Sequence, residues 1–103
     1  MPKIGLLGGD FQHAFSSTLW KGPTRFTWSK GEILDTTFFV DRAIAANINT
    51  PCKNKYAWIV ESRVIIPDVI RDVKKYWQDI SKSYRYLFTH HKEIYSLADN
   101  FIY

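Results

Sequence analysis

Acidic and imidazole side chains follow several apolar runs of this sequence, where they could accept or hold a proton. Glu61 comes directly after Tyr-Ala-Trp-Ile-Val, and a carboxylate in such company is costly unless it is paired or used. Asp10 follows an apolar run and two glycines, Asp41 follows Thr-Thr-Phe-Phe-Val, and His90 and His91 follow Tyr-Leu-Phe-Thr. A carboxylate in such a place can take a proton from an incoming hydroxyl group. These residues are therefore the first candidates for an active site.

Each candidate also has a structural interpretation that involves no chemistry. The carboxylates can cap a turn or pair with an arginine, and the histidines can be surface residues that precede a short helix. For Asp41 the adjacent Arg42 is such a partner, and for Glu61 the partners are Arg42 or Arg63. Singly, none of these residues indicates a function, so their interpretation depends on whether the fold brings them together.

Five segments predict the strands that would position these residues. Apolar, β-branched and aromatic residues concentrate at 3–9, 35–41, 56–61, 84–91 and 100–103. Between them, a helix is predicted from Pro67 to Ile80, because proline suits a first helical turn and apolar residues recur at helical spacing after it. Shorter helical segments are predicted after Asp41 and at 92–98.

This alternation of strands and helices predicts an α/β fold with a small, open, mostly parallel sheet of four to five strands and flanking helices. Ligands of open parallel sheets bind beyond the carboxyl ends of the strands. If the strands are parallel, the carboxyl ends at Asp10, Asp41, Glu61 and His90 share one edge of the sheet. Their coincidence there is what favours a functional interpretation.

Several common catalytic patterns are absent from the sequence. The segment Gly-Leu-Leu-Gly-Gly-Asp lacks the spacing of a dinucleotide-binding loop and the lysine of a P-loop. There is no GxSxG motif and no HExxH or HxH spacing, so neither a metal nor a cofactor is expected. Cys52 is the only cysteine, which excludes an internal disulfide and a cysteine zinc cluster.

Length and composition predict one domain spanning residues 1–103, since 103 residues suffice for a single core. The formal net charge is +4, but the basic residues are scattered rather than clustered, so nucleic acid is an unlikely partner. No apolar stretch approaches the roughly 18 residues of a membrane span, and no membrane association is expected. The apolar core of the N-terminal segment is too short for a signal peptide. Because the single cysteine also favours a reducing environment, we expect a cytoplasmic protein.

Two segments resemble a known family. WIVESRVIIPDVI and, further on, YRYLFTHHKEIYSLADNFIY resemble the N-terminal half of fucosyltransferase-like glycosyltransferases of the family-10 type, especially divergent members from viruses and marine microbes. The opening IGLLGGDFQHAFSSTLW is similar to the start of those members. The resemblance implies one half of a Rossmann-like two-lobe architecture, namely the lobe that binds a carbohydrate acceptor.

The resemblance also implies roles for individual residues. Glu61 would be the general base that deprotonates the acceptor hydroxyl during inverting transfer from a nucleotide sugar. Asp10, His13, Ser62 and His90 would bind substrate around the cleft between the lobes. The lobe that holds the nucleotide sugar in the family has no counterpart in this sequence. Because the nucleotide supplies much of the binding energy used in the transition state, we expect a lobe that is inactive alone or depends on a partner.

Three hypotheses follow for function. The first is the glycosyltransferase-related acceptor lobe, either as a truncated reading frame or as a chain that works with a donor-lobe partner. The second is a non-enzymatic, homo-oligomeric interaction module, with the C-terminal residues 101–103 in the contact. The third, which the scattered charge disfavours, is a binder of single-stranded nucleic acid that uses Trp20, Phe26 and Trp28 beside Lys21 and Arg25.

Overall fold

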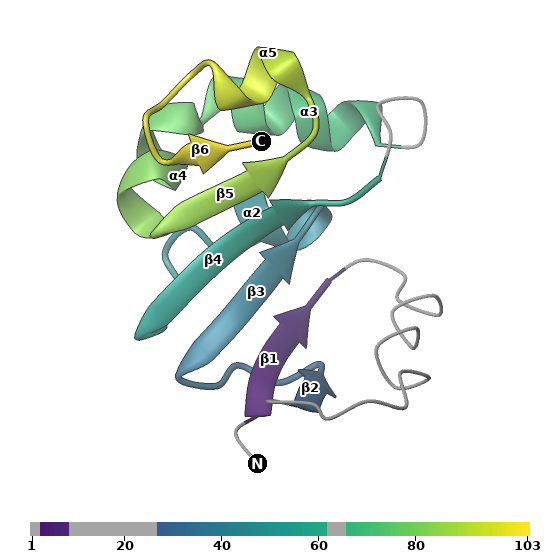
Figure 1. Ribbon diagram of the computed structural model, residues 1–103, viewed down its shortest axis with the longest axis vertical. Helices are drawn as coiled ribbons and strands as arrows, with labels where there is room; N and C mark the ends of the chain where they lie inside the picture. The colour runs from purple at the N-terminus through teal and green to yellow at the C-terminus, as the bar shows by residue number, and fades with distance from the viewer. Residues whose placement is uncertain (1–2, 9–26, 62–65) are drawn as a thin grey trace.

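Six parallel strands lie side by side in one open sheet of the computed structural model, which describes residues 3–8, 27–61 and 66–103 (Figure 1). The order across the sheet is β2-β1-β3-β4-β5-β6, and every neighbouring pair is parallel. The strands are β1 (Lys3–Leu7), β2 (Thr27–Lys30), β3 (Thr36–Val40), β4 (Asn54–Ile59), β5 (Tyr86–Thr89) and β6 (Phe101–Ile102). The expected α/β fold with a parallel sheet is thus confirmed.

The sheet has one strand more than the four to five predicted, and β2 is the addition. Its four residues, Thr-Trp-Ser-Lys, are too few to display an alternating pattern. Its pairing with the edge of β1 is a tertiary contact that local sequence does not encode. The other five strands fall within the predicted segments, except that β4 begins two residues earlier, at Asn54.

The described helices between the strands are α2 (Arg42–Ala46), α3 (Pro67–Lys75), α4 (Trp77–Ser83) and α5 (Lys92–Tyr95). The predicted long helix begins at Pro67 as expected, but it is interrupted at Tyr76, which ends α3 and precedes α4. Val73 before the interruption and Ile80 after it are both buried. No described helix is long and apolar enough to cross a membrane.

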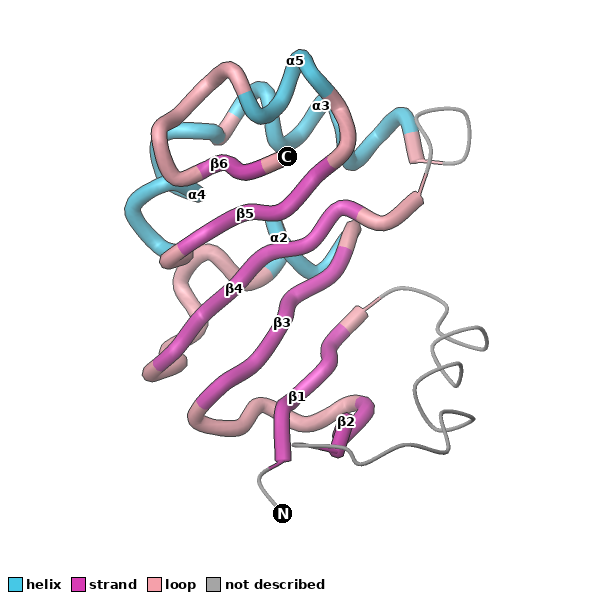
Figure 2. Tube along the Cα trace, viewed as in Figure 1, coloured by secondary structure: helices cyan, strands magenta, loops and turns pink. Residues whose placement is uncertain are grey.

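The hydrophobic core lies between the helices and one face of the sheet, and Figure 2 shows α2 behind β3 and β4. The side chains of a parallel strand alternate between the two faces. The strand residues that face the helices are Phe39, Ala57, Ile59, Leu87 and Phe101, and they meet Ile44, Val69, Ile70, Val73, Ile80 and Ile94. This one-sided layer holds the strands in their order.

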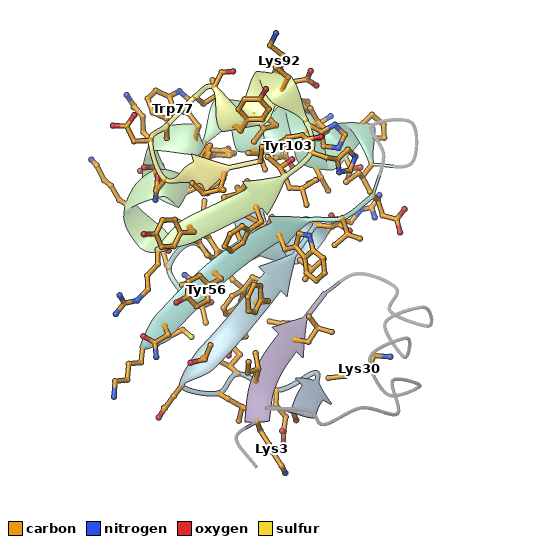
Figure 3. All side chains as sticks on the ribbon, in the orientation of Figure 1. Lys3, Lys30, Tyr56, Trp77, Lys92 and Tyr103 are labelled. Carbon is orange, nitrogen blue, oxygen red and sulfur yellow. The ribbon has the colours of Figure 1, made fainter. Side chains whose placement is uncertain are left out.

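The opposite face of the sheet carries aromatic rings. Phe38, Tyr56 and Trp58 of β3 and β4 lie beside Tyr86 and Phe88 of β5 in a continuous set of ring contacts. Tyr56 is seen on the near side of the sheet in Figure 3. No helix among the described residues covers these rings (Figure 1). We refer to these five residues as the aromatic face.

A short crossover at one end of the sheet depends on Gly5. Residues 31–35 connect β2 to β3 by passing across β1, whereas parallel strands usually need a connection of about a dozen residues or more. A Cβ atom at Gly5 would lie 2.5 Å from the carbonyl oxygen of Glu32 and 2.6 Å from Thr37 Oγ1. Thr37 Oγ1 in turn bonds the backbone N–H and C=O of Leu34, both at 2.8 Å. The missing side chain therefore allows the close approach.

Replacing Gly5 by alanine is expected to lower the free energy of unfolding by about 2 kcal/mol or more, because the new methyl group meets backbone that cannot move freely. Gly31→Ala is the control: a Cβ there contacts nothing within 4 Å, and only the positive φ of 78° opposes it, at about 1–2 kcal/mol. Urea denaturation of both variants measures the difference. A loss at Gly5 no larger than at Gly31 would contradict this account of the crossover.

Candidate functional site

The parallel sheet brings the carboxyl ends of β3, β4 and β5 to one edge. Val40 pairs with Trp58, and Ile59 pairs with Thr89, so the residues after these strands are neighbours. They are Asp41, Glu61, His90 and His91. The other candidates predicted for this edge, Asp10, His13 and Ser62, lie outside the described residues. We refer to Asp41, Glu61, His90 and His91 as the edge cluster.

Asp41 is the most constrained member of the edge cluster. It is only 4% exposed and has a φ of 51° with ψ of −113°, which is unusual for a residue with a side chain. Its N–H donates to the carbonyl oxygen of Trp58 at 3.1 Å, and its Oδ1 accepts from the N–H of Val60 at 2.9 Å. Asp41 therefore fastens the end of β3 to the segment that carries Glu61. Such strain persists only where surrounding contacts enforce it, and it often marks functional sites.

Burial raises the pKa of Asp41 above its ordinary value of 3.8. The backbone N–H groups of Val60 and Glu61 lower it, while the Glu61 carboxylate raises it further. The two carboxylates are thus close enough to influence each other. The negative charge of Glu61 disfavours the charged form of Asp41.

Glu61 is held from the other side by a histidine. Nε2 of His91 lies 3.0 Å from the backbone carbonyl oxygen of Glu61, so Nε2 carries a hydrogen in this contact. The backbone N–H of His91 donates to Thr89 Oγ1 at 3.0 Å, which fixes the turn after β5. His90 is exposed, and its ring lies 4.2 Å from that of His91. His91 is therefore the histidine that contacts the Glu61 segment, and substrate binding by His90 stays a prediction.

Arg42 pairs with neither Asp41 nor Glu61 in a salt bridge. Its Nε and Nη2 donate to the two carboxylate oxygens of Asp68 at 3.0 and 3.1 Å. This bidentate pair joins the first turns of α2 and α3. Arg42 therefore forms its salt bridge with Asp68 rather than with Asp41 or Glu61, although its charge lowers the pKa of Asp41. Arg63, the other arginine considered for Glu61, lies outside the described residues.

A groove of about 390 Å³ opens beside Asp41, between α2 and α3. Polar groups from Asp41, Arg42, Asp68 and Asp72 contribute to its walls. Two larger hollows of about 690 Å³ each lie elsewhere: one between the α2–β4 connection and α4, and one at the amino-terminal end of the sheet. Of these three hollows among the described residues, the groove beside Asp41 is lined by a member of the edge cluster. Ala45, Ala46 and Val69 supply the apolar part of its walls, so the groove offers both polar and apolar contacts to a ligand.

Lys55 is a second buried ionisable residue, with an exposure of 4%. Its ammonium group donates to the carbonyl oxygens of Asn47 and Ile48 at 2.5 and 3.1 Å and to Ser83 Oγ at 2.7 Å. It also lies 4.5 Å from the ring centroid of Tyr84. Burial lowers its pKa from 10.5. Because all three of its donors are used on the chain itself, Lys55 stabilises the end of α2 and is not available as a nucleophile.

The described residues contain no group of three or more His, Cys, Asp or Glu side chains that could hold a metal ion. No protein-family model, curated protein or solved structure matches this chain. The geometry of the edge cluster is therefore what bears on function.

Sequence reasoning placed Asp41 at a strand end and among the first candidates, but it gave Asp41 no catalytic or substrate-binding role. The position of Asp41 in the sequence could have indicated a role. Asp41 directly follows the apolar end of β3, and Glu61 comes two residues after the apolar end of β4. Its burial and its bond to Val60 depend on the pairing of β3 with β4 and could not be read from local sequence. The same is true of the contact between His91 and Glu61.

Asp41→Asn is expected to change how stability depends on pH. Because the folded-state pKa is raised, Asp41 favours folding below its unfolded pKa of about 4, and this contribution is lost as the pH rises through the folded value. Asparagine keeps an oxygen for Val60 N–H and tolerates positive φ, but it does not ionise. From pH 4 to 7 the variant should therefore gain stability relative to the original protein. Urea denaturation across this range measures it, and a constant difference would contradict the assignment.

Lys55→Met is expected to lower the free energy of unfolding by about 2–4 kcal/mol, because it leaves buried carbonyl oxygens without a donor. Lys53→Met is the matched control, since Lys53 is an exposed lysine two residues away, and its effect should be within about 0.5 kcal/mol. Thermal and urea denaturation of both variants test this. Equal effects of the two substitutions would show that the hydrogen bonds of Lys55 contribute little.

Proposed function

We propose that this chain is the acceptor-side lobe of a glycosyltransferase-related protein, with Glu61 as the base that acts on the acceptor hydroxyl. The observation that carries the proposal is the edge cluster: two carboxylates and two histidines come from three adjacent strands to the carboxyl edge of a parallel sheet. This is the edge at which open α/β sheets bind their ligands.

The strand order adds support. β2 and β3 lie on opposite sides of β1, so the order reverses there, and ligands of doubly wound sheets bind at the carboxyl ends beside such a reversal. Asp41 follows β3, the strand next to β1. Its groove and the side chain of Glu61, which is partly exposed, flank the position that an acceptor sugar would occupy.

In the proposed reaction, Glu61 removes the proton of the acceptor hydroxyl. The acceptor oxygen then bonds to the anomeric carbon of the donor sugar, and the nucleotide leaves with the electron pair of the broken bond. Asp41 and His91 would act as positioning residues, because they hold the backbone on either side of Glu61. Asp10, His13, Ser62 and His90 complete the substrate-binding residues of the proposal.

The nucleotide sugar would be bound by a separate donor lobe, so the chain by itself would bind acceptor without transferring sugar to it. Activity would require a donor lobe, supplied either by a longer form of this chain or by a partner. The single cysteine favours a reducing, cytoplasmic setting for this assembly.

A second candidate function is that of a non-enzymatic interaction module. It is favoured by Tyr86 and Ile102, two large hydrophobic side chains that are 46% and 37% exposed on the side of the sheet that carries the aromatic face, since apolar surface left in water favours association. In this case the surface that matters is the face of the sheet rather than its carboxyl edge.

The acceptor proposal is tested by titrating a panel of neutral oligosaccharides into the protein and following its NMR amide signals. We expect at least one oligosaccharide to shift signals at the carboxyl edge. Glu61→Gln should weaken that binding about tenfold or more, since a hydrogen bond to a charged group contributes roughly 1.5–3 kcal/mol. Nucleotide sugars should produce no comparable shifts.

Asp35→Asn serves as the control, because it also converts a carboxylate to an amide, and Asp35 lies at the opposite end of the sheet, before β3. It should leave oligosaccharide binding unchanged. The proposal fails if no oligosaccharide of the panel binds, or if the Glu61 and Asp35 variants bind like the original protein.

A further inference from the structure

Two of the hollows on the helical side of the sheet meet along α2. The groove beside Asp41 and the hollow at the α2–β4 connection both have Ala45 and Ala46 in their walls. The methyl groups of these two alanines are too small to close the passage between the two spaces. Their volumes, about 390 and 690 Å³, each lie within the roughly 300–1,000 Å³ of ordinary ligand pockets. We refer to the two hollows together as the α2 groove.

The residues of both walls follow one another in chain order along the α2 groove. One wall passes from Asp41 through Ala45 to Thr50. The other passes from Asp68, in the first turn of α3, to Tyr76, directly after its last turn. Because an α-helix rises about 1.5 Å per residue, Asp68 and Tyr76 lie roughly 12 Å apart along this wall. The groove thus begins at the edge cluster and is longer than a single sugar ring.

Hydrogen bonds join the two walls at each end of the groove. Near the edge cluster, Arg42 of one wall donates to both carboxylate oxygens of Asp68 on the other, at 3.0 and 3.1 Å. At the far end, Ser83 Oγ of α4 donates to the carbonyl oxygen of Ile48 at 2.5 Å. The buried ammonium group of Lys55 donates to these same two oxygens, at 2.7 and 3.1 Å. The fold therefore fixes the spacing of the walls before a ligand binds, which lowers the entropic cost of binding.

The charges along the groove are largely balanced within the fold. Asp68 is paired with Arg42, and Asp72 is paired with Arg71. The charged side chains that line the far end are of opposite sign, Asp79 and Lys82. A ligand of high net charge gains little from such a lining, so the groove favours a neutral ligand.

The far end of the groove combines an aromatic ring with polar groups. Tyr76 is 39% exposed there, and its ring offers an apolar surface with a hydroxyl group at its tip. Asn49 and Thr50 supply an amide and a hydroxyl group that exchange hydrogen bonds with hydroxyl groups of a ligand. A pyranose ring packs its C–H face on an aromatic side chain while its hydroxyl groups bond to such neighbours. The lining therefore matches the chemistry of a sugar.

We propose that the α2 groove binds an oligosaccharide acceptor, whose reacting sugar lies at the edge cluster and whose further units extend past Ala45 and Ala46 to Tyr76. This inference rests on the proposed function, which supplies the reacting sugar beside Glu61. It adds that the acceptor is a chain of several units rather than a single sugar. Binding energy from the remote units then becomes available at the reacting centre.

The test compares short and long ligands by NMR titration of the full chain. The probes are glucose, galactose, mannose and N-acetylglucosamine, each as the monosaccharide and as a neutral tetrasaccharide of the same sugar. At least one tetrasaccharide should bind about tenfold or more tightly than its monosaccharide, a difference of roughly 1.4 kcal/mol. Both should shift amide signals at the edge cluster, whereas only the tetrasaccharide should shift those of Asn49 and Thr50.

Tyr76→Ala should weaken binding of that tetrasaccharide about tenfold and leave monosaccharide binding unchanged, because Tyr76 contacts only the remote units. Ala46→Phe should have the same effect, since Ala46 is exposed and a larger side chain fills the passage between the two hollows. Tyr86→Ala is the matched control: Tyr86 is a similarly exposed tyrosine (46%) on the other face of the sheet. It should bind both ligands like the original protein.

The outcomes separate this inference from the proposed function. If every tetrasaccharide binds like its monosaccharide, and Tyr76→Ala and Ala46→Phe change nothing, the inference is overturned while the role of Glu61 stands. If tetrasaccharide binding depends on Tyr76 but is unchanged in Glu61→Gln, the groove is confirmed as a sugar site and the role of Glu61 is overturned. Shifts in the groove with a tetralysine peptide but with no oligosaccharide would identify a site for cationic peptides and overturn the inference. Binding of no sugar at all would overturn both.

Discussion

The parallel pairing of β3, β4 and β5 is the constraint on which the rest of the structure depends. Their common direction places three strand ends at one edge and gives Asp41, Glu61 and His91 a shared location. The same register stacks the aromatic side chains across neighbouring strands on the outer face. An antiparallel neighbour would separate the edge residues and shift the rings out of line. The edge cluster and the aromatic face therefore both result from the parallel pairing of β3, β4 and β5.

Two buried ionisable residues illustrate how burial alone does not define a site. Lys55 and Asp41 are each 4% exposed, and both are bonded to backbone groups. Lys55 uses all of its donors within the fold, which makes it a structural residue. Asp41 instead adjoins a groove, carries backbone strain and interacts electrostatically with Glu61. Asp41 is a candidate site residue because it lies beside Glu61, whose side chain is partly exposed, whereas Lys55 stabilises the fold.

The two faces of the sheet have different consequences for assembly. The helical side is closed by a layer of aliphatic residues around Phe39 and Leu87. The other side carries the aromatic face, on which Tyr86 and Ile102 are exposed while Val40 is fully buried. Exposed apolar side chains of this kind remain hydrophobic in water. The carboxyl edge lies at the ends of the strands, apart from these two residues.

The sequence by itself determined the elements whose signals are local. Pro67 and the helical spacing after it located α3, and the apolar segments located five of the strands and the strand-end position of Glu61. Tertiary structure decided what depends on pairing between distant segments. It added the four-residue β2, turned Arg42 toward Asp68, and chose His91 over His90 as the contact of Glu61. These outcomes depend on which strands pair with each other in the folded chain. The periodicity of residues along a single strand or helix carries no information about this pairing.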